Sequence, residues 1–287
     1  PGPDVMTLTR LGIKPTPQHT PWPDLLAMWR RADANEAIEP AWVFDHFYPN
    51  FSDSAGPGLE GWTVLSALAH ETERLRIGTM VNGMPYRHPA VTANMAATVD
   101  MISNGRLELG LGAGWNQEEA GAYGISLGAS LGERMDMFDE GVEAIVGLLS
   151  DEETTLDGIH VQLTNARCEP KGPQRPHPPI VIGGGGERRT LRTVAKWADH
   201  WNSIPLEAEA WLHKRAVLDQ HCADVGRDPA EIMNSMIFRL DPDDPGRLAD
   251  ETAQFAMLGV ALAVVNVPTP HNPEHVDMIG ALAAAMA

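Results

Sequence analysis

The stretch that decides the fold is G-R-L-E-L-G-L-G-A-G-W-N-Q-E-E, at residues 105–119. Its leucines alternate with Glu108 and glycines, the period-two pattern of a β-strand. We expect the leucines to face the helices that cover a parallel sheet, and Glu108 and the glycines to point the other way. Beyond the strand, residues 112–114 have almost no side chain, so a flat ligand could lie against the backbone. The same residues also fit an ordinary tight turn into a helix.

Outward from that strand, extended and helical patterns alternate along the whole chain. We expect eight strands, at residues 8–14, 41–44, 75–81, 107–112, 180–182, 200–204, 232–240 and 261–267. Helices are expected between them, with the longest at 131–149 and the last at 273–286. A hairpin is expected at 154–163, between strands four and five. The pattern predicts an α/β fold, a (β/α)₈ TIM barrel with an insertion between strands four and five, as one domain over 1–287. A doubly wound sheet is the competing fold, but no G-x-G-x-x-G opens the first unit.

Composition restricts the function. The formal net charge of −18 argues against nucleic acid or an anionic membrane as a partner, because phosphates would be repelled. No apolar run reaches the length of a membrane span, and residues 1–10 lack the features of a signal peptide. Two cysteines are too few for a disulfide framework, so we expect a cytoplasmic protein.

Polar residues follow the predicted strands, where a barrel carries its active site. Asp45 and His46 end strand two, and a histidine there can exchange a proton near neutral pH. Adjacent strand residues point to opposite sides, so only one of the pair is expected to face the pocket unless the strand is already turning. A histidine bound to a backbone carbonyl fits the same pattern. His19 stands alone after strand one, and no H-x-H or H-x-x-x-H pair indicates a metal site.

Four consecutive glycines at 183–186 follow strand five and are expected to open a helix. Their exposed N–H groups and the helix dipole would favour a phosphate. Arg188, Arg189 and Arg192 would add positive charge on an otherwise acidic chain. A flexible turn beside a solvated basic helix face is the alternative.

Several stretches in order resemble the luciferase-like monooxygenase superfamily, most of all its coenzyme F420-dependent oxidoreductases. The matching stretches are W-V-F-D-H-F (42–47), R-I-G-T-M-V (76–81), Y-R-H-P-A (86–90), G-R-L-E-L-G-L-G-A-G-W (105–115), L-G-E-R (131–134) and P-P-I-V-I-G-G (178–184). The resemblance implies hydride transfer at the barrel mouth between F420 and an unidentified substrate, with His46 as the candidate proton donor. It also implies a cis peptide at Met80–Val81. An FMN-dependent monooxygenase using O₂ and a non-catalytic deazaflavin-binding protein are the alternatives, and a homodimer is left open.

The resemblance and the strand-end pattern together predict a coenzyme-binding set at the mouth: Asp45, His46, Met80, Val81, Asn82, Gly83, Gly112, Ala113, Gly114, Trp115, Gly183, Gly184, Gly185 and Gly186. The histidine spacing gives no reason to expect a metal. The partner implied by the resemblance is a small-molecule substrate. One position departs from the sugar-phosphate dehydrogenases of this group. They carry a catalytic glutamate immediately after the strand-four glycines, where this chain has Trp115. A sugar-phosphate substrate is therefore in doubt.

Overall fold

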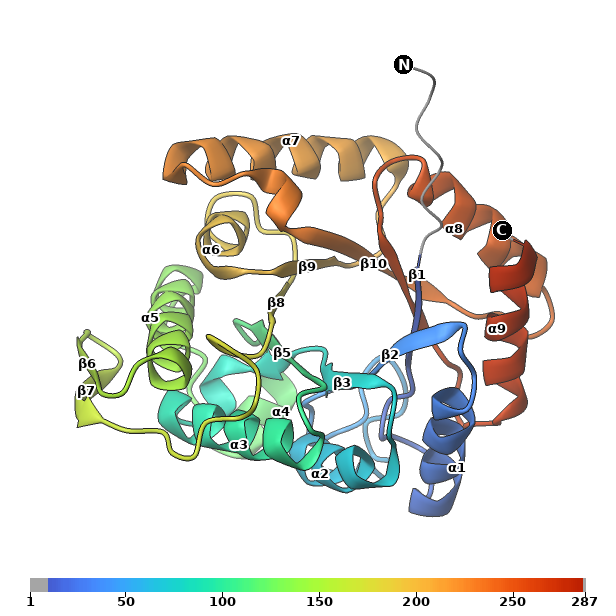
Figure 1. Cartoon of the computed structure of the whole chain (residues 1–287), viewed down its shortest axis with the longest axis horizontal. Helices are drawn as coiled ribbons and strands as arrows, with labels where there is room; N and C mark the ends of the chain where they lie inside the picture. Colours follow the sequence, from blue (N-terminus) through green and yellow to red (C-terminus); the bar gives the residue numbers. More distant parts are fainter. Residues whose placement is uncertain (1–9, 286–287) are drawn as a thin grey trace.

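The computed structural model describes residues 10–285, and eight parallel strands close into a barrel within them (Figure 1). In order around the ring these are β1 (Arg10–Lys14), β2 (Ile38–Val43), β3 (Arg76–Thr79), β5 (Leu107–Gly112), β8 (Ile180–Gly183), β9 (His200–Ser203), β10 (Met233–Arg239) and β11 (Leu262–Asn266). β11 pairs with β1, and β3 pairs with β5 across the seam. The predicted barrel is confirmed. Residues 8–9 of the first predicted strand and residue 286 of the last helix lie outside the described residues.

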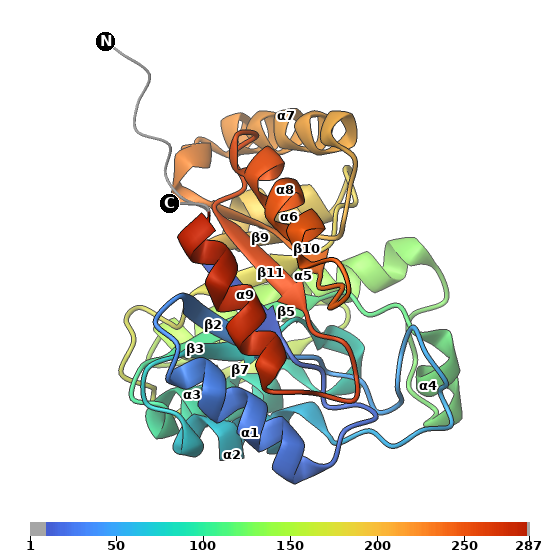
Figure 2. The same ribbon diagram turned by 90° about the vertical axis from the view of Figure 1, so that its right-hand side faces the viewer.

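Helices surround the strands in Figure 1. They are α1 (Trp22–Asp33), α2 (Gly61–Glu71), α3 (Pro89–Ile102), α4 (Gln117–Ala122), α5 (Leu131–Ser150), α6 (Thr190–Trp197), α7 (Ala208–Val225), α8 (Pro245–Ala256) and α9 (Glu274–Ala285), with 3₁₀ turns η1 (Met84–Tyr86) and η2 (Pro229–Glu231). α9 lies beside α1, where Arg31 makes a two-pronged ion pair with Asp277 (Figure 2). No helix within residues 10–285 is long and apolar enough to cross a membrane.

The core has two parts because successive side chains of each strand point to opposite faces. The three leucines of β5 are fully buried in the layer between strands and helices, as predicted. A smaller apolar cluster that includes Trp42 and Val264 fills the barrel interior. Glu108 also points inward, and its Oε1 accepts a 2.5 Å hydrogen bond from Nε of Arg76. A mid-strand carboxylate inside a packed barrel requires a partner, and this ion pair supplies it.

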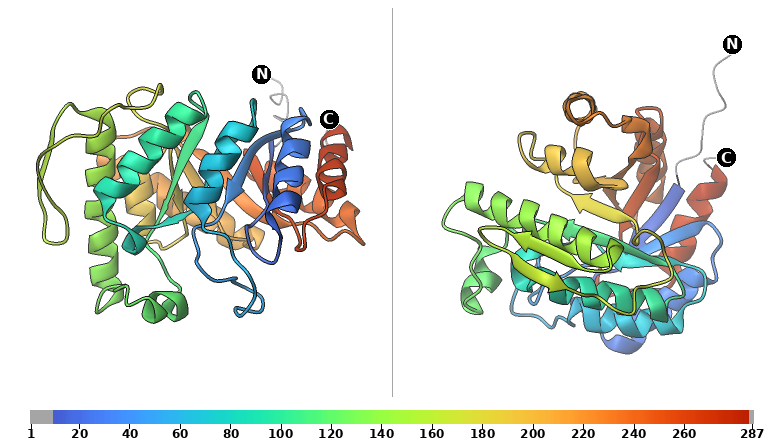
Figure 3. Two further views of the ribbon diagram at one scale, coloured as in Figure 1. Left: turned by 90° about the horizontal axis from the view of Figure 1, so that it is seen from below. Right: turned by 60° about the vertical axis from the view of Figure 1, so that its left-hand side comes forward.

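The segment between β5 and β8 contains the expected insertion. β6 (Thr154–Asp157) and β7 (Gln162–Ala166) form an antiparallel hairpin that lies against α5 (Figure 3). The turn closes where the N–H of Gly158 donates to the carbonyl of Val161. The insertion lies on the outside of the barrel and leaves the ring of strands intact.

The third barrel strand is shorter than predicted. β3 ends at Thr79, the Met80–Val81 peptide is cis as the resemblance implied, and the chain resumes as β4 (Asn82–Gly83) beside β5. β5 can approach β3 closely because Gly110 has no side chain. A Cβ there would lie 1.9 Å from the carbonyl oxygen of Thr79.

Candidate active site

A cavity of about 410 Å³ opens at the carboxyl ends of the strands. Most of the predicted coenzyme-binding residues line it, namely Asp45, His46, Met80, Val81, Gly83, Gly112, Ala113, Gly114, Trp115, Gly183 and Gly184. Residues from five strand ends, far apart in the sequence, therefore meet at one mouth. Metal ligands are not grouped there: among the described residues, no three His, Cys, Asp or Glu side chains could hold a metal ion together.

Three predicted residues lie away from the cavity. Asn82 is fully buried behind it, where its Oδ1 accepts a 2.9 Å hydrogen bond from Nε1 of Trp62. Asn82 therefore ties the β4 turn to α2. Gly185 and Gly186 lie further along the loop that leaves β8, beyond the residues that line the cavity.

Asp45 and His46 both line the cavity. Strand alternation would let only one of them face the pocket, but β2 ends at Val43, so the stated exception of a strand that is already turning applies. The chain has already left the sheet at Asp45, so the alternation no longer applies. The two side chains have different contacts, which indicate different roles.

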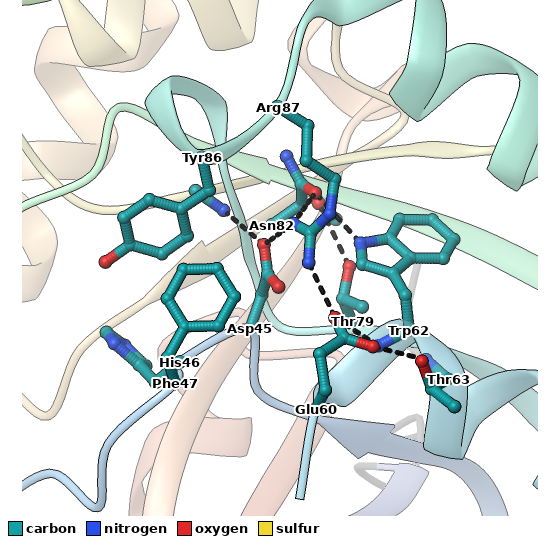
Figure 4. A network of polar contacts seen from close by, with 12 residues as sticks. Asp45, His46, Phe47, Glu60, Trp62, Thr63, Thr79, Asn82, Tyr86 and Arg87 are labelled. Carbon is teal, nitrogen blue, oxygen red and sulfur yellow. Dashed lines mark hydrogen bonds and ion pairs between the residues drawn. The ribbon is translucent and has the colours of Figure 1, made fainter. Parts of the chain in front are cut away.

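Asp45 is held by a buried ion-pair network (Figure 4). Its Oδ2 accepts a 2.7 Å bond from Nη1 of Arg87 and a 3.1 Å bond from the N–H of Gly83. Nη2 of the same guanidinium donates to Glu60 at 2.6 Å. Burial raises the pKa of Asp45, against the opposing pull of Arg87. The Oδ1 atom is buried without a partner among the described residues, so it can accept a hydrogen bond from a ligand.

His46 is oriented by Glu119, a residue that the sequence did not identify as part of the site. Oε1 of Glu119 lies 2.5 Å from Nδ1 of His46 and also accepts a hydrogen bond from the hydroxyl of Tyr86. Its Oε2 accepts from the N–H groups of Phe47 and Tyr48, at 2.8 and 3.3 Å. Burial alone would raise the pKa of Glu119, but these hydrogen bonds outweigh it and the pKa is lowered. The carboxylate is therefore ionised at neutral pH.

An ionised Glu119 can only accept, so Nδ1 of His46 carries the hydrogen in this pair. Nε2 is then the ring nitrogen left to exchange a proton with a molecule in the cavity, and no described residue occupies it. Burial raises the pKa of Tyr86, and the hydrogen bond to Glu119 and the charge of that carboxylate raise it further. The Tyr86 hydroxyl therefore keeps its proton and remains a donor. A carboxylate that orients a histidine in this way favours proton transfer at one defined atom.

Aromatic side chains form one wall of the mouth. Trp115 is half exposed and stacks on Phe51, with ring centroids 5.5 Å apart and planes 23° apart. The His46 ring makes an edge-to-face contact with the same tryptophan, with ring centroids 5.5 Å apart. Exposed stacked rings beside a proton-exchanging group suit a planar or apolar ligand.

The glycines of β5 and β8 have a packing reason that the sequence did not reveal. A Cβ at Gly112 would lie 2.5 Å from Cγ2 of Val81, and one at Gly183 would lie 2.9 Å from Cγ1. The Val81 side chain thus occupies the space that these glycines leave open. Close approach of a flat ligand is not needed to explain them.

The glycine loop presents free amide groups, although it does not open the helix directly. α6 begins at Thr190, four residues after the last glycine. Gly184 has φ of +108° and donates its N–H to the carbonyl of Asn202 at 3.0 Å. The N–H groups of Gly185 and Gly186 donate to no described residue. Unpaired N–H groups of this kind fit an anion such as phosphate.

The basic cluster beside this loop is weaker than the sequence indicated. Arg189 is paired with Asp136 at 2.6 Å and with Asp139 at 2.8 Å, and Arg192 also reaches Asp139. The acidic residues come from α5, whose face the sequence did not place beside α6. Of the three predicted arginines, only Arg188 has no ion pair with a described residue.

Other strand-end residues divide between two places. Asn202 lines the main cavity, whereas Gln18 and Asn266 line a smaller recess beside it. His19 lines neither space, and its Nε2 lies 3.0 Å from Oγ of Ser52. Lys14 lines both spaces and was not among the predicted site residues, although strand one was expected to end at this residue.

Comparison with known proteins agrees with this architecture. Residues 4–275 match the family model described as luciferase-like monooxygenase. An uncharacterized protein of Mycobacterium tuberculosis (strain ATCC 25618 / H37Rv) is 30% identical over 230 residues, which cover 80% of this chain and 77% of the relative. The F420-dependent glucose-6-phosphate dehydrogenase of Amycolatopsis mediterranei (strain U-32) is 29% identical over 193 residues, or 67% of this chain and 55% of that enzyme. A solved F420-dependent secondary alcohol dehydrogenase, in complex with an F420–acetone adduct, superposes with a TM-score of 0.83 at 19% identity, covering 98% of this chain and 99% of the other.

Proposed function

Because the chain belongs to the luciferase-like monooxygenase family, we propose that it is an F420-dependent oxidoreductase acting on a small organic substrate at the barrel mouth. The observation that carries the proposal is the buried Glu119–His46 pair, which presents one ring nitrogen to the cavity. Relatives and similar structures whose names include F420 support the deazaflavin over FMN. An FMN-dependent monooxygenase on the same fold is the alternative.

The residues present fit a flavin-type coenzyme. The unpartnered Oδ1 of Asp45 can accept from an N–H of the ring, and Met80 and Val81 offer an apolar surface beneath it. The free N–H groups of Gly185 and Gly186 can hold a phosphate. We therefore propose that the coenzyme lies across the arc from β2 to β8.

In the proposed reaction the coenzyme would supply the hydride chemistry, and the chain's own groups would orient the ring, restrict water and hold the proton. A bound F420 would supply hydride transfer at its C5 atom. Asp45, fixed by Arg87, would orient the ring, and the aromatic pair of Trp115 and Phe51 would restrict water at the mouth. His46 would hold or accept the substrate's proton at Nε2, with Glu119 stabilising the charged imidazole.

Titration of the purified protein with F420 and with FMN, followed by coenzyme fluorescence and absorbance, tests the coenzyme. We expect F420 to bind more tightly. Tight binding of FMN alone would contradict the proposal. A panel of alcohols and carbonyl compounds would then be screened for oxidation or reduction of bound F420. F420 binding without turnover in the whole panel would favour a non-catalytic binder.

His46→Ala tests the proton-transfer role. We expect turnover to fall about 10²- to 10⁴-fold, with much less change in F420 affinity, because proton transfer typically contributes that much. His19→Ala is the matched control, since His19 lies outside the cavity. Unchanged turnover in His46→Ala would reduce this residue to part of the wall.

Gly184→Val and Gly185→Val test the phosphate loop. Both should weaken coenzyme binding, and the loss should shrink for a coenzyme fragment without the phosphate. Gly226→Val is the control, because Gly226 also has positive φ (+73°) and has no atom within 4 Å of its Cβ position. It should share the backbone strain of Gly184→Val without the affinity loss. Equal affinity in all variants would remove the phosphate from this loop.

A further inference from the structure

Two positive charges at the barrel mouth have no counter-charge. Of the chain's 21 lysines and arginines, only Lys14, Arg188 and Arg239 have neither an ion pair nor a hydrogen bond with a described residue. Acidic residues outnumber basic ones 39 to 21, so unpaired cations are unexpected on this chain. Lys14 and Arg239 end two strands of the barrel and line the same recess.

Strand register places these cations in one layer. Lys14 of β1 pairs with Asn266 of β11, and Asn266 pairs in turn with Arg239 of β10. The preceding residues, Ile13 and Phe238, are buried in the outer core. Successive residues of a strand point to opposite faces of the sheet. The side chains of Lys14, Asn266 and Arg239 therefore point into the barrel, at the carboxyl ends of its strands.

The recess that they line has a volume of about 210 Å³ and is built without carboxylates. Gln18 and Asn50 fix one wall, because the Gln18 side chain accepts from the Asn50 N–H at 2.9 Å and donates to its carbonyl at 3.3 Å. Oδ1 of Asn266 is buried and has no partner among the described residues, so it can accept from a hydroxyl of a bound molecule but does not itself bind the anion. Lys14 also lines the main cavity, so the two spaces share this side chain.

We propose that this recess is an anion subsite that holds the carboxylate or phosphate of the substrate while its reactive carbon faces the coenzyme. This inference rests on the proposed function and names the substrate class, a small alcohol or carbonyl compound with an anionic group. β1, β11 and β10 lie across the ring from the arc between β3 and β8. The anion would thus bind on the side of the mouth opposite the coenzyme.

The charge state of Lys14 agrees with this role. Burial lowers the pKa of Lys14 from 10.5 to about 8, which still leaves the ammonium charged at neutral pH. Lys14 is partly buried and has no side-chain partner among the described residues, so an anion in the recess would stabilise its charge. Arg239 is exposed at the rim of the recess, and its planar guanidinium can donate hydrogen bonds to the same anion.

Calorimetric titration of the F420-free and F420-loaded protein with inorganic phosphate, acetate and pyruvate tests the subsite directly. We expect Lys14→Gln and Arg239→Gln each to weaken binding of the preferred anion about 10- to 100-fold, the range for losing a charge-assisted hydrogen bond. Lys196→Gln is the matched control, because Lys196 lies on α6 and pairs with Glu143. It should bind anions as the wild type does. Melting temperatures check that Lys14→Gln folds, and Arg239→Gln changes an exposed side chain.

The outcomes separate this inference from the proposed function. Binding of phosphate alone assigns a phosphorylated substrate, and binding of carboxylates alone assigns an organic acid; both support the subsite. Anion binding that depends on Lys14 and Arg239 without any F420 binding would leave the subsite standing and remove the coenzyme. F420 binding with no anion bound at millimolar concentration, or with equal affinities in wild type and both variants, would overturn the subsite.

Discussion

Substituting Glu119 by Gln keeps the shape of the side chain and removes its charge. One carboxylate oxygen accepts from His46 and Tyr86, and the other accepts from the N–H groups of Phe47 and Tyr48. A glutamine amide must turn its NH₂ toward one of these two pairs of donors. The backbone N–H groups cannot change role, whereas the imidazole and the hydroxyl can accept. The NH₂ of Glu119→Gln should therefore face the histidine and the tyrosine.

The magnitude follows from the four hydrogen bonds. Bonds to a charged group contribute about 1.5–3 kcal/mol each and neutral ones about 0.5–1.5 kcal/mol. The two short bonds to His46 and Tyr86 lose the most, about 1–1.5 kcal/mol each by that difference. We expect Glu119→Gln to lower the free energy of unfolding by about 2–3 kcal/mol at pH 7.

The loss should depend on pH in a defined direction. The pKa of Glu119 is lowered in the folded protein relative to its ordinary value of 4.5. Its ionisation therefore stabilises the fold at pH values above 4.5, and this contribution disappears as the pH falls through the lower folded-state pKa. The difference between wild type and Glu119→Gln should therefore shrink as the pH falls below about 4.5.

Urea denaturation from pH 4 to 8 measures this difference, and nitrogen NMR of the ring reports which nitrogen of His46 is protonated. We expect Glu119→Gln to move the hydrogen from Nδ1 to Nε2. Glu118→Gln is the control, because Glu118 is exposed and only accepts a bond from Ser54. A Glu119→Gln protein as stable as Glu118→Gln, or a difference that grows in acid, would refute the reasoning.

Two further substitutions test the packing around the mouth. Arg87→Met leaves the buried carboxylate of Asp45 without its ion-pair partner and should lower the free energy of unfolding, measured by chemical denaturation, by about 3–5 kcal/mol. Arg31→Met, which breaks an exposed ion pair, should lower it by only about 0–1 kcal/mol. Equal losses would show that the Arg87 network contributes no more than a surface pair. Gly112→Ala should lower the melting temperature, because the new Cβ would lie 2.5 Å from the Val81 side chain. The control is Gly121→Ala in α4, whose Cβ would have no atom within 4 Å and which should stabilise the folded protein by about 0.5–1 kcal/mol. A Gly112→Ala protein that is more stable than the wild type would contradict the packing argument.

The barrel could be predicted because its signals are local. Period-two leucines at 107, 109 and 111 define a strand, and eight such units separated by helical stretches leave few topologies. Strand boundaries moved by at most three residues, most at the start of β2, and β3 ends two residues early, where the chain breaks at Met80–Val81. The ion pair of Glu108 was also accessible, because a mid-strand carboxylate inside a barrel requires a partner.

The site was only partly predictable because its partners are distant in sequence. Glu119 lies 73 residues from His46, and no local pattern connects them. The same holds for Arg189, whose charge is compensated by Asp136 and Asp139, about 50 residues earlier. Lys14 is different: alternation from Ile13 would have shown that it points into the barrel. Strand one was expected to end at this residue, so the sequence contained the information needed to include it.

The mouth divides into a half whose charges are satisfied by the protein and a half whose charges are not. On the arc from β2 to β5, Asp45 is compensated by Arg87, and Glu119 by His46 and its hydrogen-bond donors. These groups are therefore held in place before any ligand arrives, which is what orienting a coenzyme ring requires. On the arc from β10 to β1, Lys14 and Arg239 have no side-chain partner among the described residues, so under the proposed subsite an incoming anion would compensate their charge. Selection among substrates would then depend on charge at the second arc, and chemistry on geometry at the first.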